Sequence, residues 1–223
     1  MNDKLSLACG FDGADAAGAP GVRALVTPCL AGPPEHTRGA ARRLARQALA
    51  EALAQALACE PRHIQITDQR GQAPRALWHD QAPRDARRAA LLVATGLSIS
   101  HAPGCSLIAW HADGAVGVDL QPTDAADALP LEEMQRIAAL YLGPEVCRAL
   151  RAGGPTVFSD RWAAHEARLK CLGVALQEWS PALQARMQAC ATRALRRPDT
   201  LAGSPRWSAA VAWRRRADQP ASR

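Results

Sequence analysis

The residues best suited to chemistry in this chain are an acid and a cation one helical turn apart, Glu166 and Lys170. Phe158 and Trp162 precede them at the same four-residue spacing, so in a helix all four fall on one slowly drifting stripe. An i,i+4 ion pair on a solvated face would stabilise the helix by only about 0.2–0.5 kcal/mol. Here the charges continue an aromatic line, which indicates that they lie where the stripe leaves the core.

Lysine is rare in this chain. Only two of its 27 basic residues are lysines, Lys4 and Lys170, and the others are arginines. A lysine ammonium is a compact point charge with rotatable donors, whereas a guanidinium is a planar fork. We therefore interpret Lys170 as a charge kept for a tight site that holds phosphate oxygens. A surface ion pair with Glu166 is the alternative.

An acidic residue inside an apolar strand is the second chemical feature. Asp119 falls in the strand predicted at 115–120, and a buried carboxylate is costly unless it is paired or binds a cation. Strand alternation places Gln121 on the same side as Asp119. Asp119 and Glu166 together offer two ligands to Mg²⁺, which typically takes one or two protein carboxylates and completes its shell with water and phosphates. The alternative for Asp119 alone is a carboxylate that caps a turn.

Further candidate binding groups lie upstream. Ser100 and His101 end a predicted strand, and their hydroxyl, imidazole and neighbouring amides suit phosphate or sugar oxygens. A structural, hydrogen-bonding histidine is the alternative. The first turns of a helix predicted at 35–59 are crowded with arginines, which are interpreted either as a solvated surface or as a phosphate site. These are Arg38, Arg42, Arg43 and Arg46.

Three motifs, in this order, resemble the signature of the 4′-phosphopantetheinyl transferases. They are SISHAPG at 98–104, GVDLQ at 117–121 and the pattern FxxxWxxxEAxxKxxG at 158–173. The chain length and a GxxP element at 71–74 resemble the larger, surfactin-synthetase-type branch, whose members are monomeric and pseudo-duplicated. The similarity covers about residues 20–213.

The resemblance implies transfer of the phosphopantetheine arm of coenzyme A to a serine of an apo acyl or peptidyl carrier protein, with release of adenosine 3′,5′-bisphosphate. It implies Mg²⁺ as the cofactor, held by Asp119 and Glu166, with Gln121 a weaker third candidate because many members have an acid there. Glu166, Lys170 and Asp119 would be catalytic, with Glu166 as the base or water-orienting group and Lys170 on the pyrophosphate. The residues implied in coenzyme A binding are Ser100, His101, Lys170, Arg38, Arg42, Gln72 and Arg75.

Besides Gln121, three positions depart from the family pattern. His165 stands where a lysine commonly precedes the glutamate. In the loop at 71–74, Gln72 replaces a usual basic residue and Ala73 is inserted before Pro74. Nucleotide affinity is the property that these departures affect most.

Composition sets the class of protein. The chain has seven scattered cysteines and no CxxC spacing, which favours reduced thiols and a cytoplasmic location. It has no apolar run long enough to span a membrane and no signal-peptide pattern at its start. A net charge of +6 and a pI near 9.3 favour an acidic partner such as a carrier-protein helix. From the resemblance we also expect a monomer.

The order of predicted elements indicates an α+β fold of two similar α/β halves, 1–113 and 114–223, related by a pseudo-two-fold axis. In the first half we expect strands near 5–9, 23–27, 63–67, 97–100 and 105–111, the helix at 35–59, and a polar loop or short helix at 81–90. In the second half we expect strands at 115–120, 208–213 and, more weakly, 183–186, and helices at 131–142, 145–151 and 156–172. A polar, flexible tail is expected from residue 214.

Two other functions stay open. A non-catalytic relative would bind coenzyme A or a carrier protein without transfer. A basic nucleic-acid-binding protein would depend on charge, but the chain has no interleaved aromatic and basic stripe, zinc-ligand spacing or recognition-helix signature. We therefore favour the transferase and expect neither a nucleic-acid nor a membrane partner.

Overall fold

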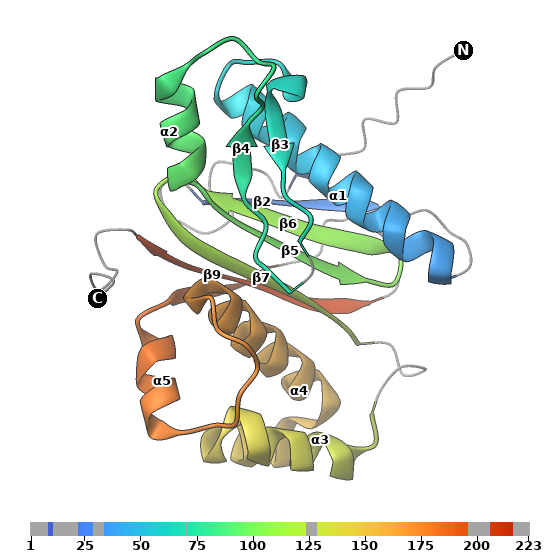
Figure 1. Ribbon diagram of the computed structural model, residues 1–223. Coiled ribbons are helices and arrows are strands. Elements are labelled where there is room, and N and C mark those ends of the chain that lie inside the picture. The colour runs from blue at the N-terminus through green and yellow to red at the C-terminus, as the bar shows by residue number, and fades with distance from the viewer. Residues whose placement is uncertain are drawn as a thin grey trace.

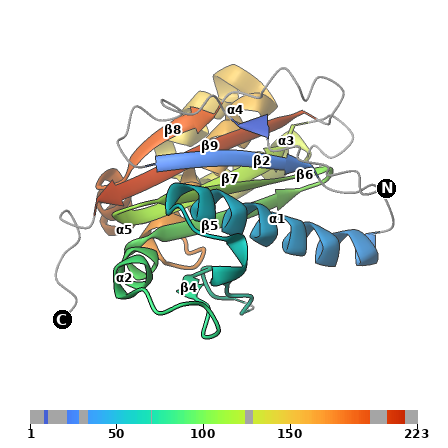
Figure 2. The same cartoon turned by 90° about the horizontal axis from the view of Figure 1, so that it is seen from above.

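The computed structural model describes residues 9–10, 22–28, 34–69, 71–123, 129–195 and 206–215. The chain has a mixed α+β fold, in which two sheets lie face to face and a long helix covers the outer face of each (Figures 1 and 2). Within the described residues, no helix is both long enough and apolar enough to cross a membrane.

The first sheet is antiparallel, with the strand order β1-β2-β6-β5. Its strands are β1 (Cys9–Gly10), β2 (Val22–Pro28), β5 (Gly96–Ala102) and β6 (Cys105–His111). The strands predicted at 23–27, 97–100 and 105–111 are confirmed. Of the strand predicted near 5–9, residues 5–8 lie outside the described part of the chain.

Helix α1 (Pro34–Ala56) covers the outer face of this sheet, as the helical periodicity predicts. Leu49 and Leu53 on its buried side pack in one cluster with Leu97 and Ile108 of the strands. Arg42 and Arg43 of its first turns are exposed, because a guanidinium is costly to bury unpaired.

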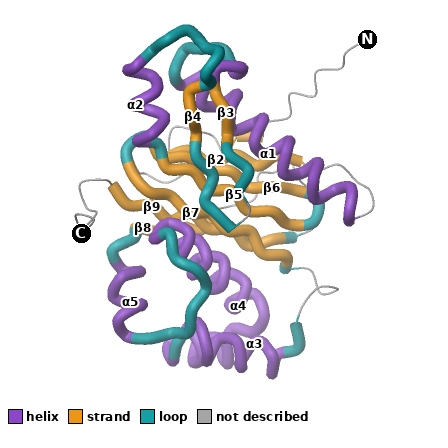
Figure 3. Tube along the Cα trace, viewed as in Figure 1, coloured by secondary structure: helices purple, strands orange, loops and turns teal. Residues whose placement is uncertain are grey.

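A small hairpin lies between α1 and α2 (Figures 1 and 3). Its strands are β3 (Ile64–Ile66), after a short 3₁₀ turn at Pro61–His63, and β4 (Ala76–Trp78). Where a loop or short helix was predicted at 81–90, the chain forms α2 (Ala86–Ala94). This helix begins late because the carboxylate of Asp85 accepts a hydrogen bond from the Arg88 amide at 2.9 Å and caps it.

The second sheet is also antiparallel, with the order β7-β9-β8. Its strands are β7 (Gly114–Pro122), β8 (Ala191–Leu195) and β9 (Trp207–Arg215). The strands predicted at 115–120 and 208–213 are confirmed, but the tail predicted from 214 starts too early, because Arg214 and Arg215 pair with Ala115 and Gly114.

Helices cover the outer face of the second sheet. The helix predicted at 131–142 is α3 (Leu131–Ile137) continued by the π-helical turn η4 (Ala138–Leu142). The two helices predicted at 145–151 and 156–172 form α4 (Pro144–Leu172), which is interrupted at Gly154 (φ 68°, ψ −162°).

The strand predicted at 183–186 is wrong, because this segment is helical in α5 (Pro181–Gln188). The hydroxyl of Ser180 accepts a hydrogen bond from the Leu183 amide at 3.1 Å, and Pro181 occupies the first turn. This start pattern of a helix outweighs the short apolar alternation on which the strand prediction relied.

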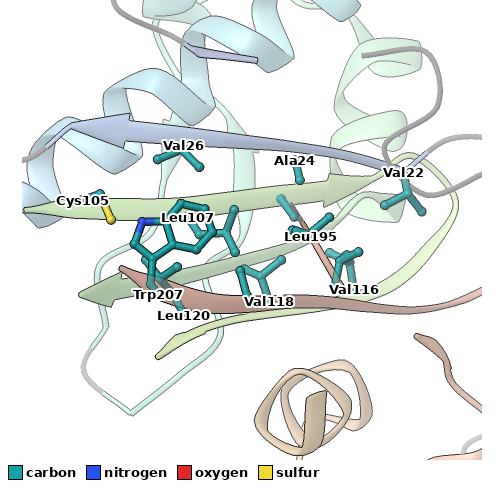
Figure 4. Close-up of a cluster of buried hydrophobic side chains, with 13 residues drawn as sticks. Val22, Ala24, Val26, Cys105, Leu107, Val116, Val118, Leu120, Leu195 and Trp207 are labelled. Atoms are coloured by element: carbon teal, nitrogen blue, oxygen red, sulfur yellow. The ribbon is translucent and has the colours of Figure 1, made fainter. Parts of the chain in front are cut away.

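The main core lies between the two sheets (Figure 4). Val26 and Leu107 enter it from the first sheet, and Val118, Trp207 and Val211 enter it from the second. The layers are therefore α1, first sheet, second sheet and α4. Each half places a helix on a sheet, while the pseudo-two-fold relation between the halves stays a prediction.

Gly117 lets α4 approach the second sheet closely. A β-carbon at Gly117 would overlap the carbonyl oxygen of Ala167 and lie 2.5 Å from the amide nitrogen of Cys171. The helix presents alanine and cysteine to this strand, so the two backbones come together with little side chain between them. This contact positions the part of α4 that carries Glu166 and Lys170.

We expect Gly117→Ala to destabilise the protein by about 2–3 kcal/mol, because neither backbone can retreat without disturbing the core. Urea denaturation measures this loss. Gly39→Ala in α1 is the matched control: its β-carbon would meet only the end of Arg43 at 3.5 Å, so the helix should gain about 0.5–1 kcal/mol. A Gly117→Ala protein as stable as the wild type would show that the close approach is not required.

Candidate functional site

Asp119 is the centre of a buried polar cluster. Its side chain is only 5% exposed, and both carboxylate oxygens accept hydrogen bonds. The Ser100 hydroxyl donates to Oδ1 at 2.9 Å, and the Gln121 amide donates from Nε2 to Oδ2 at 2.7 Å. The serine comes from β5 of the first sheet and the aspartate from β7 of the second, so the cluster lies where the sheets meet.

Lys170 joins this cluster from α4. Its Nζ lies 2.6 Å from Asp119 Oδ1, and it also donates to the carbonyl oxygen of Val118 at 3.1 Å and to Ser100 Oγ at 3.4 Å. Among the described residues Lys170 forms its ion pair with Asp119 and not the surface pair with Glu166 that was the alternative. The lysine side chain remains 33% exposed, so the protein covers it only in part.

Glu166 is half-buried beside this pair. Burial raises the pKa of its carboxyl, the Asp119 carboxylate raises it further, and Lys170 lowers it. The structure assigns its carboxylate no hydrogen bond or ion pair with any described residue. A half-buried carboxylate near a second one favours a bound cation or a proton, since both relieve the repulsion.

The acidic residues fit a magnesium ion only as a two-carboxylate site. No group of three His, Cys, Asp or Glu residues gathers in the described part of the chain. Two carboxylates suffice when water and phosphate complete the shell. Among the described residues Oδ1 of Asp119 accepts from Ser100 and Lys170, whereas Oδ2 accepts only from Gln121, so Oδ2 keeps a lone pair for a cation. In this arrangement the Gln121 amide donates to Asp119 and orients it.

Positive charges from α1 and α4 act on His101, the next residue after Ser100. Its Nδ1 lies 2.7 Å from Ser106 Oγ. Partial burial lowers the pKa of His101, and the positive charges of Arg42, Arg46 and Lys170 lower it further. Three cations therefore act on one imidazole, which is the charge distribution that an anionic ligand would neutralise.

The loop that follows β3 is tied to α1 near these cations. Arg46 pairs with Asp68 and donates from Nε to the carbonyl oxygen of Thr67 at 3.1 Å. The amide of Arg75 in turn donates to Thr67 Oγ1 at 2.9 Å. Gln72 and Arg75 are exposed on this loop. Of the predicted coenzyme-binding residues, only the Arg38 side chain lies outside the described residues.

Two residues that carry the geometry were not singled out from the sequence. Arg46 was grouped with its neighbours as a solvated or phosphate-binding residue, whereas it fastens the loop. Ser98 accepts a hydrogen bond from the Val118 amide at 3.0 Å and so joins β5 to β7. The signal for Ser98 was its alternation with Ser100, which places both hydroxyls on one face of the strand.

The aromatic half of the stripe anchors α4. Phe158 is buried in a cluster with Met134, and Trp162 stacks on it with ring centroids 5.8 Å apart. Tyr141 meets Trp162 edge to face at 5.9 Å. The core role predicted for Phe158 and Trp162 is confirmed.

His165 does not join the polar cluster. It is 4% exposed, and its Nε2 has no hydrogen-bond partner among the described residues. Burial, and next the positive charge of Arg168, lower the pKa of His165 to about 4. The residue at the position where a lysine is common is therefore a neutral, buried imidazole at neutral pH.

Comparison with known proteins agrees with the location of the site. The family model of the 4′-phosphopantetheinyl transferase superfamily matches residues 115–212. This segment runs from β7 into β9 and contains Asp119, Glu166 and Lys170. A search of curated proteins finds no match to the chain. Residues 115–212 are thus similar to this transferase superfamily, while the surfactin-synthetase-type branch stays a prediction.

We expect the Lys170–Asp119 pair to be strongly coupled. Lys170→Met should destabilise the protein by about 3 kcal/mol, because it leaves a buried carboxylate near Glu166 with only neutral donors. Asp119→Asn should recover at least about 1 kcal/mol of this loss in the double variant, as a four-protein denaturation cycle measures. Arg136→Met, which breaks an exposed pair with Glu133, is the control and should cost under about 0.5 kcal/mol. Additive losses at Lys170 and Asp119 would contradict the coupling.

The buried His165 should make the protein less stable in mild acid. In the unfolded chain His165 binds a proton near pH 6.5, whereas in the folded chain its pKa is about 4. The unfolded state therefore binds more protons between these values, and the free energy of unfolding falls as pH drops through this window. We expect a loss of about 2 kcal/mol between about pH 7.5 and about pH 5 that is absent in His165→Leu. Urea denaturation at both pH values compares the two proteins in chloride buffer. An equal pH dependence in the two would show that His165 is protonated in the folded protein.

Proposed function

We propose that this protein transfers the 4′-phosphopantetheine arm of coenzyme A to a serine of an apo acyl or peptidyl carrier protein, with Mg²⁺ as cofactor. The observation that carries the proposal is the convergence of Ser100, Asp119, Glu166 and Lys170 from β5, β7 and α4. The match of the transferase superfamily to the segment that holds three of these residues supports it.

The cationic side of the cluster suits the phosphates of coenzyme A. The positive charge of Lys170 would neutralise the pyrophosphate, and the Ser100 hydroxyl would turn from Asp119 to donate to one of its oxygens. Arg42 and His101 would hold the remaining phosphate or sugar oxygens. The two are near enough that the charge of Arg42 lowers the pKa of His101. The exposed loop with Gln72 and Arg75 is the candidate for the nucleotide end.

The acidic side of the cluster suits the reacting serine. A bound Mg²⁺, held by Asp119 and Glu166, would supply charge neutralisation to the phosphate oxygens. Glu166 would accept the proton of the carrier serine. The serine Oγ forms a bond to phosphorus, the phosphoanhydride P–O bond breaks, and adenosine 3′,5′-bisphosphate leaves with the bonding electron pair.

The carrier protein is proposed from charge. Carrier helices that are acidic would complement the net charge of +6, which raises the rate of encounter. We further propose that the protein acts as a monomer in the cytoplasm, from its scattered free thiols and from the branch that it resembles. A panel of fatty-acid, polyketide and peptide carriers would identify the pathway.

Incubation of apo carriers with coenzyme A and MgCl₂ tests the proposal. We expect a mass gain of one phosphopantetheine on the carrier, abolished by EDTA. Glu166→Gln should lower the rate at least about 100-fold through the loss of the base. Its free energy of unfolding should stay level or rise, because a carboxylate near Asp119 is neutralised. Glu178→Gln, which neutralises an exposed acid outside the site, is the matched control and should keep the wild-type rate.

Three outcomes would contradict this account. Coenzyme A binding without a mass gain on any carrier favours the non-catalytic relative. Unimpaired transfer by a folded Glu166→Gln protein would show that Glu166 is not the base. Transfer that persists in EDTA would show that no metal ion is required, and it would leave the proposed roles of Lys170 and Ser100 unchanged.

A further inference from the structure

A second cavity lies on the side of α4 away from the polar cluster. It measures about 260 Å³ and is bounded by α4, α5 and the segment before α5. Arg161, His165 and Arg168 line one wall, and Val146, Trp179 and Met187 line another. None of Ser100, Asp119, Glu166 or Lys170 lines it, so it is separate from the proposed transferase site.

The polar wall carries positive charge that the protein leaves unneutralised. Arg161 and Arg168 form no ion pair with a carboxylate of any described residue, although Glu145 also lines the cavity. Arg168 donates from Nε to Thr192 Oγ1 at 2.8 Å, which orients its guanidinium. Burial lowers the pKa of Arg168, the neighbouring Cys190 thiol acts in the opposite direction, and the positive charge of Arg161 lowers this pKa again. Two repelling guanidinium groups at one cavity favour a bound anion.

The apolar wall is held in place by the backbone. Gly143 has φ 83°, and a β-carbon there would lie 2.5 Å from Nε1 of Trp179, so the indole packs directly on this glycine. The Trp179 amide donates to the carbonyl oxygen of Leu140 at 2.7 Å. The indole is therefore a fixed wall against which a planar or aliphatic group can pack.

Size and polarity define the ligand. Sites for drug-sized ligands span about 300–1,000 Å³, so a cavity just below this range suits a smaller molecule. We propose that the cavity binds a small organic anion, with its carboxylate or phosphate group at Arg161 and Arg168 and its apolar body on Trp179 and Met187. His165 also lines the cavity, between the two arginines in the sequence of α4, and it is neutral at neutral pH. This site does not depend on the transferase activity.

Calorimetric titration of the full chain with phenyl phosphate and with benzoate tests the proposal, and benzyl alcohol is the neutral probe. We expect one site for at least one anion, and binding of benzyl alcohol at least about tenfold weaker, since hydrogen bonds to charged groups are worth about 1.5–3 kcal/mol. The tighter of the two anions distinguishes a phosphate ligand from a carboxylate ligand. Arg161→Gln and Arg168→Gln should each weaken binding at least about fivefold.

Two control variants locate the site. Arg151→Gln removes an exposed charge from the same helix outside the cavity, and Arg42→Gln removes one from the phosphate side of the transferase cluster. Arg151→Gln should bind the anion as the wild type does, and Arg42→Gln should lose no more than binding at the transferase cluster and keep binding at the cavity. If Arg168→Gln fails to fold because its bond to Thr192 is lost, the exposed Arg161→Gln still decides the matter. No binding of either anion, equal binding of benzyl alcohol, or a loss seen in Arg42→Gln but not in Arg161→Gln would overturn the proposal.

Discussion

The ion pair between Asp119 and Lys170 is the interaction on which the candidate site depends. A carboxylate that is 5% exposed is tolerable only because Lys170, Ser100 and Gln121 all donate to it. These donors come from both sheets and from α4, so the relative placement of three elements is tied to one charge. The close contact at Gly117 serves this pair, since a helix set further from β7 could not bring an ammonium to Asp119.

Burying this pair is a poor way to gain stability. The desolvation of two charges largely offsets their attraction, and apolar side chains of similar volume often do as well. The arrangement also leaves Glu166 half-buried, with no assigned partner and beside a like charge, which is unfavourable without a ligand. Both features are understandable if the cluster is organised to bind a cation, because a cation would relieve the repulsion between the two carboxylates.

Helix α4 serves two surfaces with different chemistry. One side presents Glu166 and Lys170 beside the second sheet, and another presents Arg161, His165 and Arg168 toward α5. Alanine residues between them contact the strands. Because residues three and four apart share a side of a helix, a single segment of about three turns lines both the polar cluster and the second cavity. The stacked Phe158 and Trp162 anchor this helix at the start of that segment.

Local patterns in the sequence were enough to predict α1, α4, most strands and the face shared by Phe158, Trp162, Glu166 and Lys170, because periodicity and end signals act over a few residues. Short elements such as β4 and β8 escaped, since three to five residues carry little pattern. The motifs also indicated the chemistry of Asp119 and Lys170. Only the tertiary structure decided that Lys170 pairs with Asp119 across 51 residues, that Gln121 donates to Asp119, and that His165 is buried beside a second cavity. Those contacts join segments far apart in the chain, and no local spacing determines which of several nearby charges a side chain will reach.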